Sequence, residues 1–175
     1  LKTILSTGSP LTHESFHYVY QSFKSDVWLA SICGGTDLLS CFVLGNPWNS
    51  VYEGQIQGPG LGMATDVASD AGKPLSDAKG ELICRKSFPS TPIGFWNDVN
   101  NTSFHSAYFK KFSNTWAHGD FAEIDSHTGG YIIHGRSDSV LNPAGVRIGT
   151  AEIYRQVESF DEILESLCIG QEWEG

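Results

Sequence analysis

The chain has few positive charges. Only 11 of its 175 residues are Lys or Arg, against 20 Asp and Glu, which gives a formal net charge of −9 and a pI near 5.0. The basic residues are scattered along the sequence. Because a phosphate backbone is bound by clustered Lys and Arg, this composition disfavours a nucleic-acid partner.

Long hydrophobic runs and paired cysteines are also missing. The sequence contains no run of about eighteen apolar residues and does not start with a basic-then-apolar leader, so we expect no membrane association. Its cysteines lie far apart without a C-x-x-C pair, so we expect them to be reduced and mostly buried in a cytoplasmic protein, instead of forming a zinc site or a catalytic thiol. They are Cys33, Cys41, Cys84 and Cys168.

The rest of the composition is that of a globular protein. Hydrophobic residues make up 40% and aromatic residues 12% of the chain, enough for the core of one ordinary domain. The sequence starts at Leu1, and its last residues offer little to pack against. We therefore expect a segment of a longer polypeptide.

Hydrophobic patterns predict a strand, a helix and a second strand in the first part of the chain. Residues 1–6 form a β-branched run that ends in a Gly-Ser-Pro loop. Thr12 is placed to cap a helix over 13–24, which carries apolar residues at three- and four-residue spacing. The continuous apolar run of 27–33 is typical of a strand covered on both faces.

The remainder favours antiparallel strands. Residues 45–92 are rich in Gly and Pro, with strand candidates at 51–56 and 81–84, as in a small antiparallel barrel or sheet. Segments 121–124 and 131–134 predict a hairpin. Beyond them we expect a turn at 141–145, a helix capped by Thr150 with Ile153, Val157 and Phe160 on one face, and a strand starting within 163–169.

One catalytic motif is rejected. His13-Glu14-Ser15-Phe16-His17 matches H-E-x-x-H, in which two histidines one helical turn apart bind zinc. A zinc peptidase also needs a third protein ligand, and the next twenty residues offer only Asp26 as a lone carboxylate in reach, since Asp37 suits another role described below. We therefore interpret these residues as a surface helix, with the zinc peptidase as a remote alternative.

Three other segments together suggest a nucleotide site. Gly34-Gly35-Thr36-Asp37 follows a buried strand, where α/β sheets place ligands. The glycines let backbone approach a ligand, the Thr hydroxyl suits a phosphate oxygen, and Asp37 suits Mg²⁺. Asp120, in Trp116-Ala117-His118-Gly119-Asp120, suits the two hydroxyls of a ribose. Either segment alone is equally well explained as a turn.

The third segment begins at Gly135-Arg136-Ser137-Asp138. Arg136 offers a planar donor fork for ribose or phosphate oxygens, and Arg147 offers a second cation for an α-phosphate. A salt-bridged hairpin end is the structural alternative. The string continues with Asn142, Gly145, Arg147 and Thr150-Ala151-Glu152-Ile153.

In order and spacing these segments resemble the adenylate-forming superfamily of acyl-CoA synthetases, luciferase-like enzymes and peptide-synthetase adenylation domains, over nearly the whole chain. The resemblance implies ATP/AMP, Mg²⁺ and coenzyme A as cofactors, and Gly80-Glu81-Leu82 as a structural strand motif. It also implies the following roles: Gly8, Ser9 and Pro10 along the adenine; Gly34, Gly35 and Thr36 at the phosphates; Asp37 at the metal; Asp120 and Arg136 at the ribose; Asp138 as hinge; Gly145 beside coenzyme A; and Arg147 at the α-phosphate. Of these, we expect Thr36, Asp37 and Arg147 to act in catalysis.

The resemblance also implies the fold. We expect an α/β protein in which residues 1–137 are the C-terminal part of the large AMP-binding domain, with a sheet edge and a small β-barrel-like subdomain. Residues 138–175 would be the hinge and the start of the small α+β C-terminal domain. The family's phosphate loop and terminal Lys are absent here, so we expect that the rest of the polypeptide is needed for activity.

The acyl substrate is suggested by the same motifs. Residues 5–11, 34–37 and 116–120 are most similar to the members that activate acetoacetate. Acetyl-CoA synthetases carry a bulky Trp where Gly34 stands, which predicts a roomier acyl pocket here. The alternatives are an acetyl- or propionyl-type synthetase and a non-catalytic nucleotide-binding module.

Overall fold

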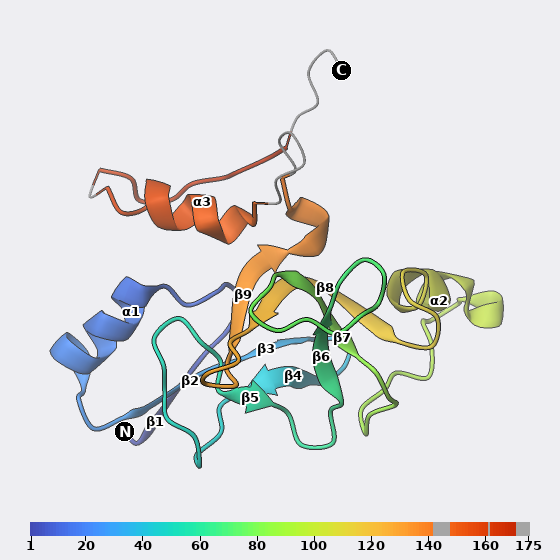
Figure 1. Ribbon diagram of the computed structural model, residues 1–175, viewed down its shortest axis with the longest axis horizontal. Coiled ribbons are helices and arrows are strands. Elements are labelled where there is room, and N and C mark those ends of the chain that lie inside the picture. Colours follow the sequence, from blue (N-terminus) through green and yellow to red (C-terminus); the bar gives the residue numbers. More distant parts are fainter. Residues whose placement is uncertain (142–147, 161, 171–175) are drawn as a thin grey trace.

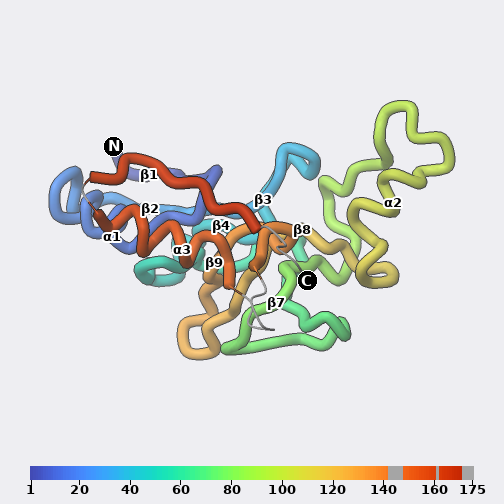
Figure 2. Tube along the Cα trace, turned by 90° about the horizontal axis from the view of Figure 1, so that it is seen from above, coloured from blue at the N-terminus to red at the C-terminus, as the bar shows by residue number. Residues whose placement is uncertain are grey.

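The computed structural model describes residues 1–141, 148–160 and 162–170. The chain forms an elongated α/β arrangement, with α1 and α2 at opposite ends of the long axis and the strands between them (Figures 1 and 2). The strands form three groups, in the orders β1-β2, β3-β4-β5 and β6-β7-β8-β9.

The first part of the chain is a strand, helix and strand unit. Strand β1 (Thr3–Ser6) pairs in parallel with β2 (Trp28–Ser31), and α1 (His13–Tyr18) connects them, continued by a π-helical turn over Val19–Phe23. The Thr12 side chain accepts a hydrogen bond from the Ser15 backbone amide, which confirms the predicted cap. Because parallel strands end at the same edge, the loops after β1 and β2 lie together.

The middle of the chain is antiparallel. β3 (Cys33–Gly35), β4 (Ser40–Leu44) and β5 (Gly58–Pro59) form one group. β6 (Thr65–Ala68), β7 (Gly80–Cys84), β8 (Trp116–Ile124) and β9 (Tyr131–Arg136) form the other. The expected strand at 81–84 and the hairpin are confirmed, and the hairpin extends back to Trp116.

An aromatic core lies between these two groups. Trp116 is buried and stacks on Tyr108 of α2 (Thr102–Tyr108), with ring centroids 3.6 Å apart. Phe42 and Phe88 meet the Trp116 ring edge-on. The start of β8 is therefore anchored in the core, directly before the candidate ribose segment.

Three local expectations were wrong. Within 51–56, residues 53–54 form a turn and only Ile56 makes a bridge, to Tyr131, because the tight turn at Gly54 (φ +74°) interrupts any strand. Helix α3 (Thr150–Val157) is capped by Gly149, whose amide donates to Glu152 Oε1, so Thr150 is its first helical residue and not the cap. The described residues of 163–169 form no strand, since no neighbouring strand accepts their backbone.

The α3 segment packs against the end of β9. An ideal Cβ on Gly149 would lie 2.2 Å from the His134 carbonyl oxygen, so only glycine permits this approach. Lys79 Nζ and Glu152 Oε2, 2.7 Å apart, tie the helix to the loop before β7. Within the described part of the chain, no helix is long and apolar enough to cross a membrane.

Candidate functional site

A cavity of about 530 Å³ lies at the shared edge of the parallel strands and the β8–β9 hairpin. It brings together segments that are far apart in the sequence, as expected for a ligand site at the carboxyl ends of parallel strands. Its lining includes the predicted residues Gly8, Ser9, Pro10, Gly34, Gly35, Thr36, Asp120 and Arg136.

Asp120 reaches this cavity because β8 bulges. Between two paired positions, β7 runs from Glu81 to Ile83 while β8 runs from Phe121 to Ala117, so β8 holds two extra residues in that interval. Such a bulge re-aims side chains out of the regular ladder. Of the bulged residues, Asp120 lines the cavity.

Glu81 holds the bulge in place. Its carboxylate is buried, and Oε1 accepts the Gly119 amide at 2.7 Å while Oε2 lies 2.8 Å from Lys111 Nζ. The bulged amide would otherwise lack a ladder partner inside the protein. The Gly-Glu-Leu motif thus has a local purpose, which is to fix the backbone beside Asp120.

Arg136 lies across the same bulge from β9. Its Nη1 donates to the His118 carbonyl oxygen and to Asp120 Oδ1, both at 3.2 Å. Gly119 makes room for the guanidinium, because an ideal Cβ there would lie 2.4 Å from Arg136 Nη2, and its φ of +82° also favours glycine. Arg136 is half exposed, so part of its guanidinium group remains open to a ligand.

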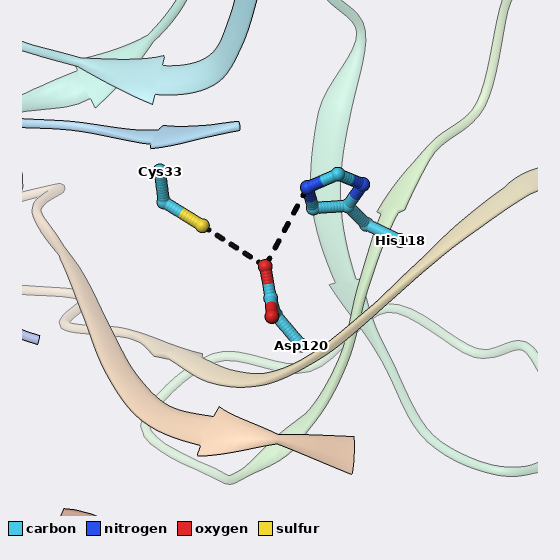
Figure 3. Close-up of side chains that lie close together, drawn as sticks. All are labelled: Cys33, His118 and Asp120. Carbon is cyan, nitrogen blue, oxygen red and sulfur yellow. Dashed lines mark hydrogen bonds and ion pairs between the residues drawn. The ribbon is translucent and has the colours of Figure 1, made fainter. Parts of the chain in front are cut away.

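The other oxygen of Asp120 faces two side chains, which Figure 3 shows together. The Cys33 thiol donates to Asp120 Oδ2 at 3.0 Å, and His118 Nε2 lies 3.5 Å from the same oxygen. Burial, and then the charge of Asp120, raise the pKa of the Cys33 thiol, which keeps it protonated at neutral pH. Within the described chain, these three residues are the group whose ligand atoms lie close enough to hold a metal ion.

Thr36 and Asp37 lie at the rim. Both are exposed, and Thr36 lines the cavity whereas Asp37 does not. Asp37 Oδ2 accepts the Tyr108 hydroxyl at 2.5 Å, which ties the rim to α2. Burial, and the Asp37 carboxylate, raise the pKa of Tyr108.

Close packing of β3 against β4 also requires glycine at position 34, in addition to the predicted role of Gly34 in the acyl pocket. An ideal Cβ on Gly34 would lie 2.2 Å from the Ser40 carbonyl oxygen and 2.6 Å from Cys41 Cα. Strands β3 and β4 approach each other too closely there for any side chain. A Trp at this position would therefore require a different path for β4.

Of the remaining predicted site residues, the structure describes Asp138 but not Gly145 or Arg147. Asp138 is exposed in a 3₁₀ turn over Ser137–Ser139, with Oδ1 3.5 Å from Arg136 Nε, and its hinge role stays a prediction. Gly145 and Arg147, with the 142–145 part of the expected turn, lie outside the described residues.

The rejected H-E-x-x-H motif has an unexpected partner. His13 Nδ1 and His17 Nε2 lie 2.8 Å and 3.1 Å from the two oxygens of Glu53, in the loop that crosses α1. The interpretation as a surface helix stands, but the sequence reasoning missed the carboxylate between the imidazoles. It also missed Cys33 and His118, since neither lies in a metal-type spacing.

The chain is similar to known proteins both in sequence and in structure. No protein-family model matches the chain. Acetoacetyl-coenzyme A synthetase of Rhizobium meliloti (strain 1021) is 61% identical over 174 residues, which cover 99% of this chain and 27% of that protein. Acetoacetyl-CoA synthetase of Gallus gallus is 52% identical over 171 residues, 98% of this chain and 26% of that protein. The chain thus spans about a quarter of the length of the curated relatives it matches.

Solved structures agree. Acetoacetyl-CoA synthetase from Streptomyces lividans superposes with a TM-score of 0.90 at 43% identity, over 99% of this chain and 27% of that one. The anthranilate CoA ligase AuaEII superposes with a TM-score of 0.72 at 20% identity, over 87% of this chain and 27% of that one, which shows the fold alone. The resemblance and the α/β fold expected from the sequence are confirmed.

Proposed function

We propose that this chain is part of an acetoacetyl-CoA synthetase, a ligase that converts ATP, acetoacetate and CoA to acetoacetyl-CoA, AMP and pyrophosphate. The observation that carries the proposal is the 61% identity to such an enzyme across 99% of the chain, on a fold that lines one cavity with the expected nucleotide-binding residues. The comparisons do not favour an acetyl-type synthetase, a non-catalytic module or a zinc peptidase.

The cavity supports a role in holding the adenosine part of the nucleotide. Asp120 presents a carboxylate that accepts from two neighbouring hydroxyls, and the exposed side of Arg136 donates to ribose oxygens. The loop of Gly8, Ser9 and Pro10 forms the adjoining wall, against which the adenine would lie. On ribose binding, the hydroxyls replace the Cys33 thiol as donors to Asp120 Oδ2.

The rim supports a role at the phosphates. Thr36 offers a hydroxyl to a phosphate oxygen, and the exposed Asp37 fits Mg²⁺, which takes one or two carboxylates together with substrate phosphates. When bound, Mg²⁺ neutralises phosphate charge, which is the main requirement of this chemistry. Arg147 would add a cation at the α-phosphate.

The reaction would proceed in two steps. An acetoacetate carboxylate oxygen attacks the α-phosphorus of ATP, forming the acyl-adenylate and releasing pyrophosphate. The CoA thiolate then attacks the acyl carbon, forming the thioester and releasing AMP. Between the steps we propose a rotation about Asp138, which exchanges the residues facing the acyl group, with Gly145 beside the CoA.

The test measures ATP–pyrophosphate exchange and AMP affinity in the full-length protein. Acetoacetate should support faster exchange than acetate or propionate, and Asp120→Asn should weaken AMP binding. Losing one hydrogen bond to a charged group costs about 1.5–3 kcal/mol, or roughly 10- to 150-fold in affinity. Asp26→Asn, at an exposed position outside the cavity, is the matched control.

Two results would contradict the proposal. Faster exchange with acetate would overturn the substrate, and AMP affinity unchanged by Asp120→Asn would overturn the ribose role. Exchange catalysed by the 175 residues alone would show that the rest of the polypeptide is dispensable.

We propose a cytoplasmic location, which cell fractionation would test.

A further inference from the structure

We propose that Cys33, His118 and Asp120 form a binding site for Zn²⁺, and that the bound metal excludes the ribose of the nucleotide from Asp120. The metal site depends only on the geometry of these side chains, while the exclusion rests on the proposed function. The cell would thereby have a means of switching off nucleotide binding without any change in the fold.

The three ligand atoms already lie near a metal-binding arrangement. Cys33 Sγ is 3.0 Å and His118 Nε2 3.5 Å from Asp120 Oδ2, and all three atoms lie within 4.8 Å of one another (Figure 3). Tetrahedral Zn²⁺ has bonds of about 2.0–2.3 Å, which place its ligand atoms about 3.3–3.6 Å apart. Small side-chain movements therefore suffice to admit the ion.

The ligand set selects among metals. One thiolate, one imidazole and one carboxylate suit Zn²⁺, which binds Cys, His and Asp alike. Mg²⁺ prefers octahedral oxygen ligands, so the Mg²⁺ that accompanies ATP should not fill this site. Cys33 and Asp120 line the cavity, so water has access to the fourth position.

Metal binding requires a specific protonation state of each of the three ligands. Binding breaks the Cys33 S–H bond and forms an S–Zn bond, and the proton leaves to solvent. Arg136 Nη1 donates a hydrogen bond to Asp120 Oδ1, so Asp120 Oδ2 is the oxygen that can bind the metal. The proton of His118 must sit on Nδ1, which costs the contact with Trp116 Nε1 at 3.5 Å, at the outer limit of a hydrogen bond.

The exclusion follows from the shared oxygen. A ribose diol bound by Asp120 needs its carboxylate oxygens as acceptors, and a metal on Oδ2 removes one of them. The metal and its water also occupy the cavity beside Cys33. Zn²⁺ and AMP should therefore compete, each weakening the apparent affinity of the other.

The experiment titrates chelator-treated full-length protein with Co²⁺, whose thiolate absorption band reports a cysteine ligand, and then displaces it with Zn²⁺. The wild-type protein should show the band, and Cys33→Ser should lose it. The Zn²⁺ affinity of Cys33→Ser should fall more than the roughly 10- to 100-fold that is typical when a residue outside the direct ligand set is lost. Cys168→Ser, on the segment after α3, is the matched control and should keep both.

The outcomes separate the two claims. A Co²⁺–thiolate band that persists in Cys33→Ser overturns the metal site; if that variant does not fold, Asp120→Asn is titrated instead and must bind Zn²⁺ more weakly. AMP affinity is measured first in the absence of metal. If AMP does not bind under this condition, the proposed function is contradicted, whereas the proposed metal site is unaffected. AMP affinity that Zn²⁺ does not change overturns the exclusion.

Discussion

Replacing Glu81 by alanine tests how the backbone beside Asp120, the proposed ribose contact, is held in place. The change removes the acceptor of the Gly119 amide and one of the two carboxylates, Glu81 and Asp70, that pair with Lys111. A hydrogen bond to a charged group contributes about 1.5–3 kcal/mol. Lys111 is about one-third exposed, so its ion pair is screened by water and contributes about 0.2–1 kcal/mol. We therefore expect a loss of about 2–4 kcal/mol from the local opening free energy of the bulge.

Hydrogen exchange measures this loss directly. Because about 1.4 kcal/mol corresponds to a tenfold change, the Gly119 amide should exchange about 30-fold to several hundred-fold faster in Glu81→Ala. The assay is exchange followed by mass spectrometry on peptides covering 116–124. AMP affinity should fall as well, since the same backbone positions Asp120.

Two variants make the test specific. Glu81→Gln keeps an oxygen acceptor without the charge and should lose about half as much, since neutral hydrogen bonds contribute about 0.5–1.5 kcal/mol. Glu165→Ala, at an exposed position, should change stability by less than about 0.5 kcal/mol. Unchanged Gly119 exchange in Glu81→Ala would refute the claim that this carboxylate fixes the bulge.

Three further predictions concern the same region. Gly119→Ala should destabilise the protein by about 1–3 kcal/mol in urea denaturation, because the added Cβ meets Arg136 and the residue has φ of +82°; an unchanged midpoint would contradict this. Burial lowers the pKa of His134, so the unfolded state takes up the proton first and stability should fall as pH drops below about 6.5; His134→Gln should flatten that dependence in denaturation series between about pH 7.5 and pH 5.5. Cys33 should react slowly with iodoacetamide at neutral pH, and Asp120→Asn should speed the reaction by removing the charge that raises the Cys33 pKa; equal rates would argue against the contact.

Local patterns were enough for much of the fold. The Thr12 cap, the strand at 81–84 and the hairpin follow from capping chemistry, alternation and turn residues, all of which act over a few neighbouring positions. The resemblance to a known family implied which residues line the cavity, from Gly8 to Arg136, although their roles stay predictions. The strand expected at 51–56 was wrong because its apolar residues bracket a tight turn.

Contacts between distant residues were settled only by the tertiary structure. Cys33 looked like one of four isolated buried thiols, and Glu81 like part of a strand motif, until β3 and β7 brought them to the bulge of β8. Glu53 meets the two imidazoles of α1 across a loop in the same way. The physical reason is that a hydrogen bond between strands depends on register and on the bulge, and neither leaves a periodic trace in the sequence.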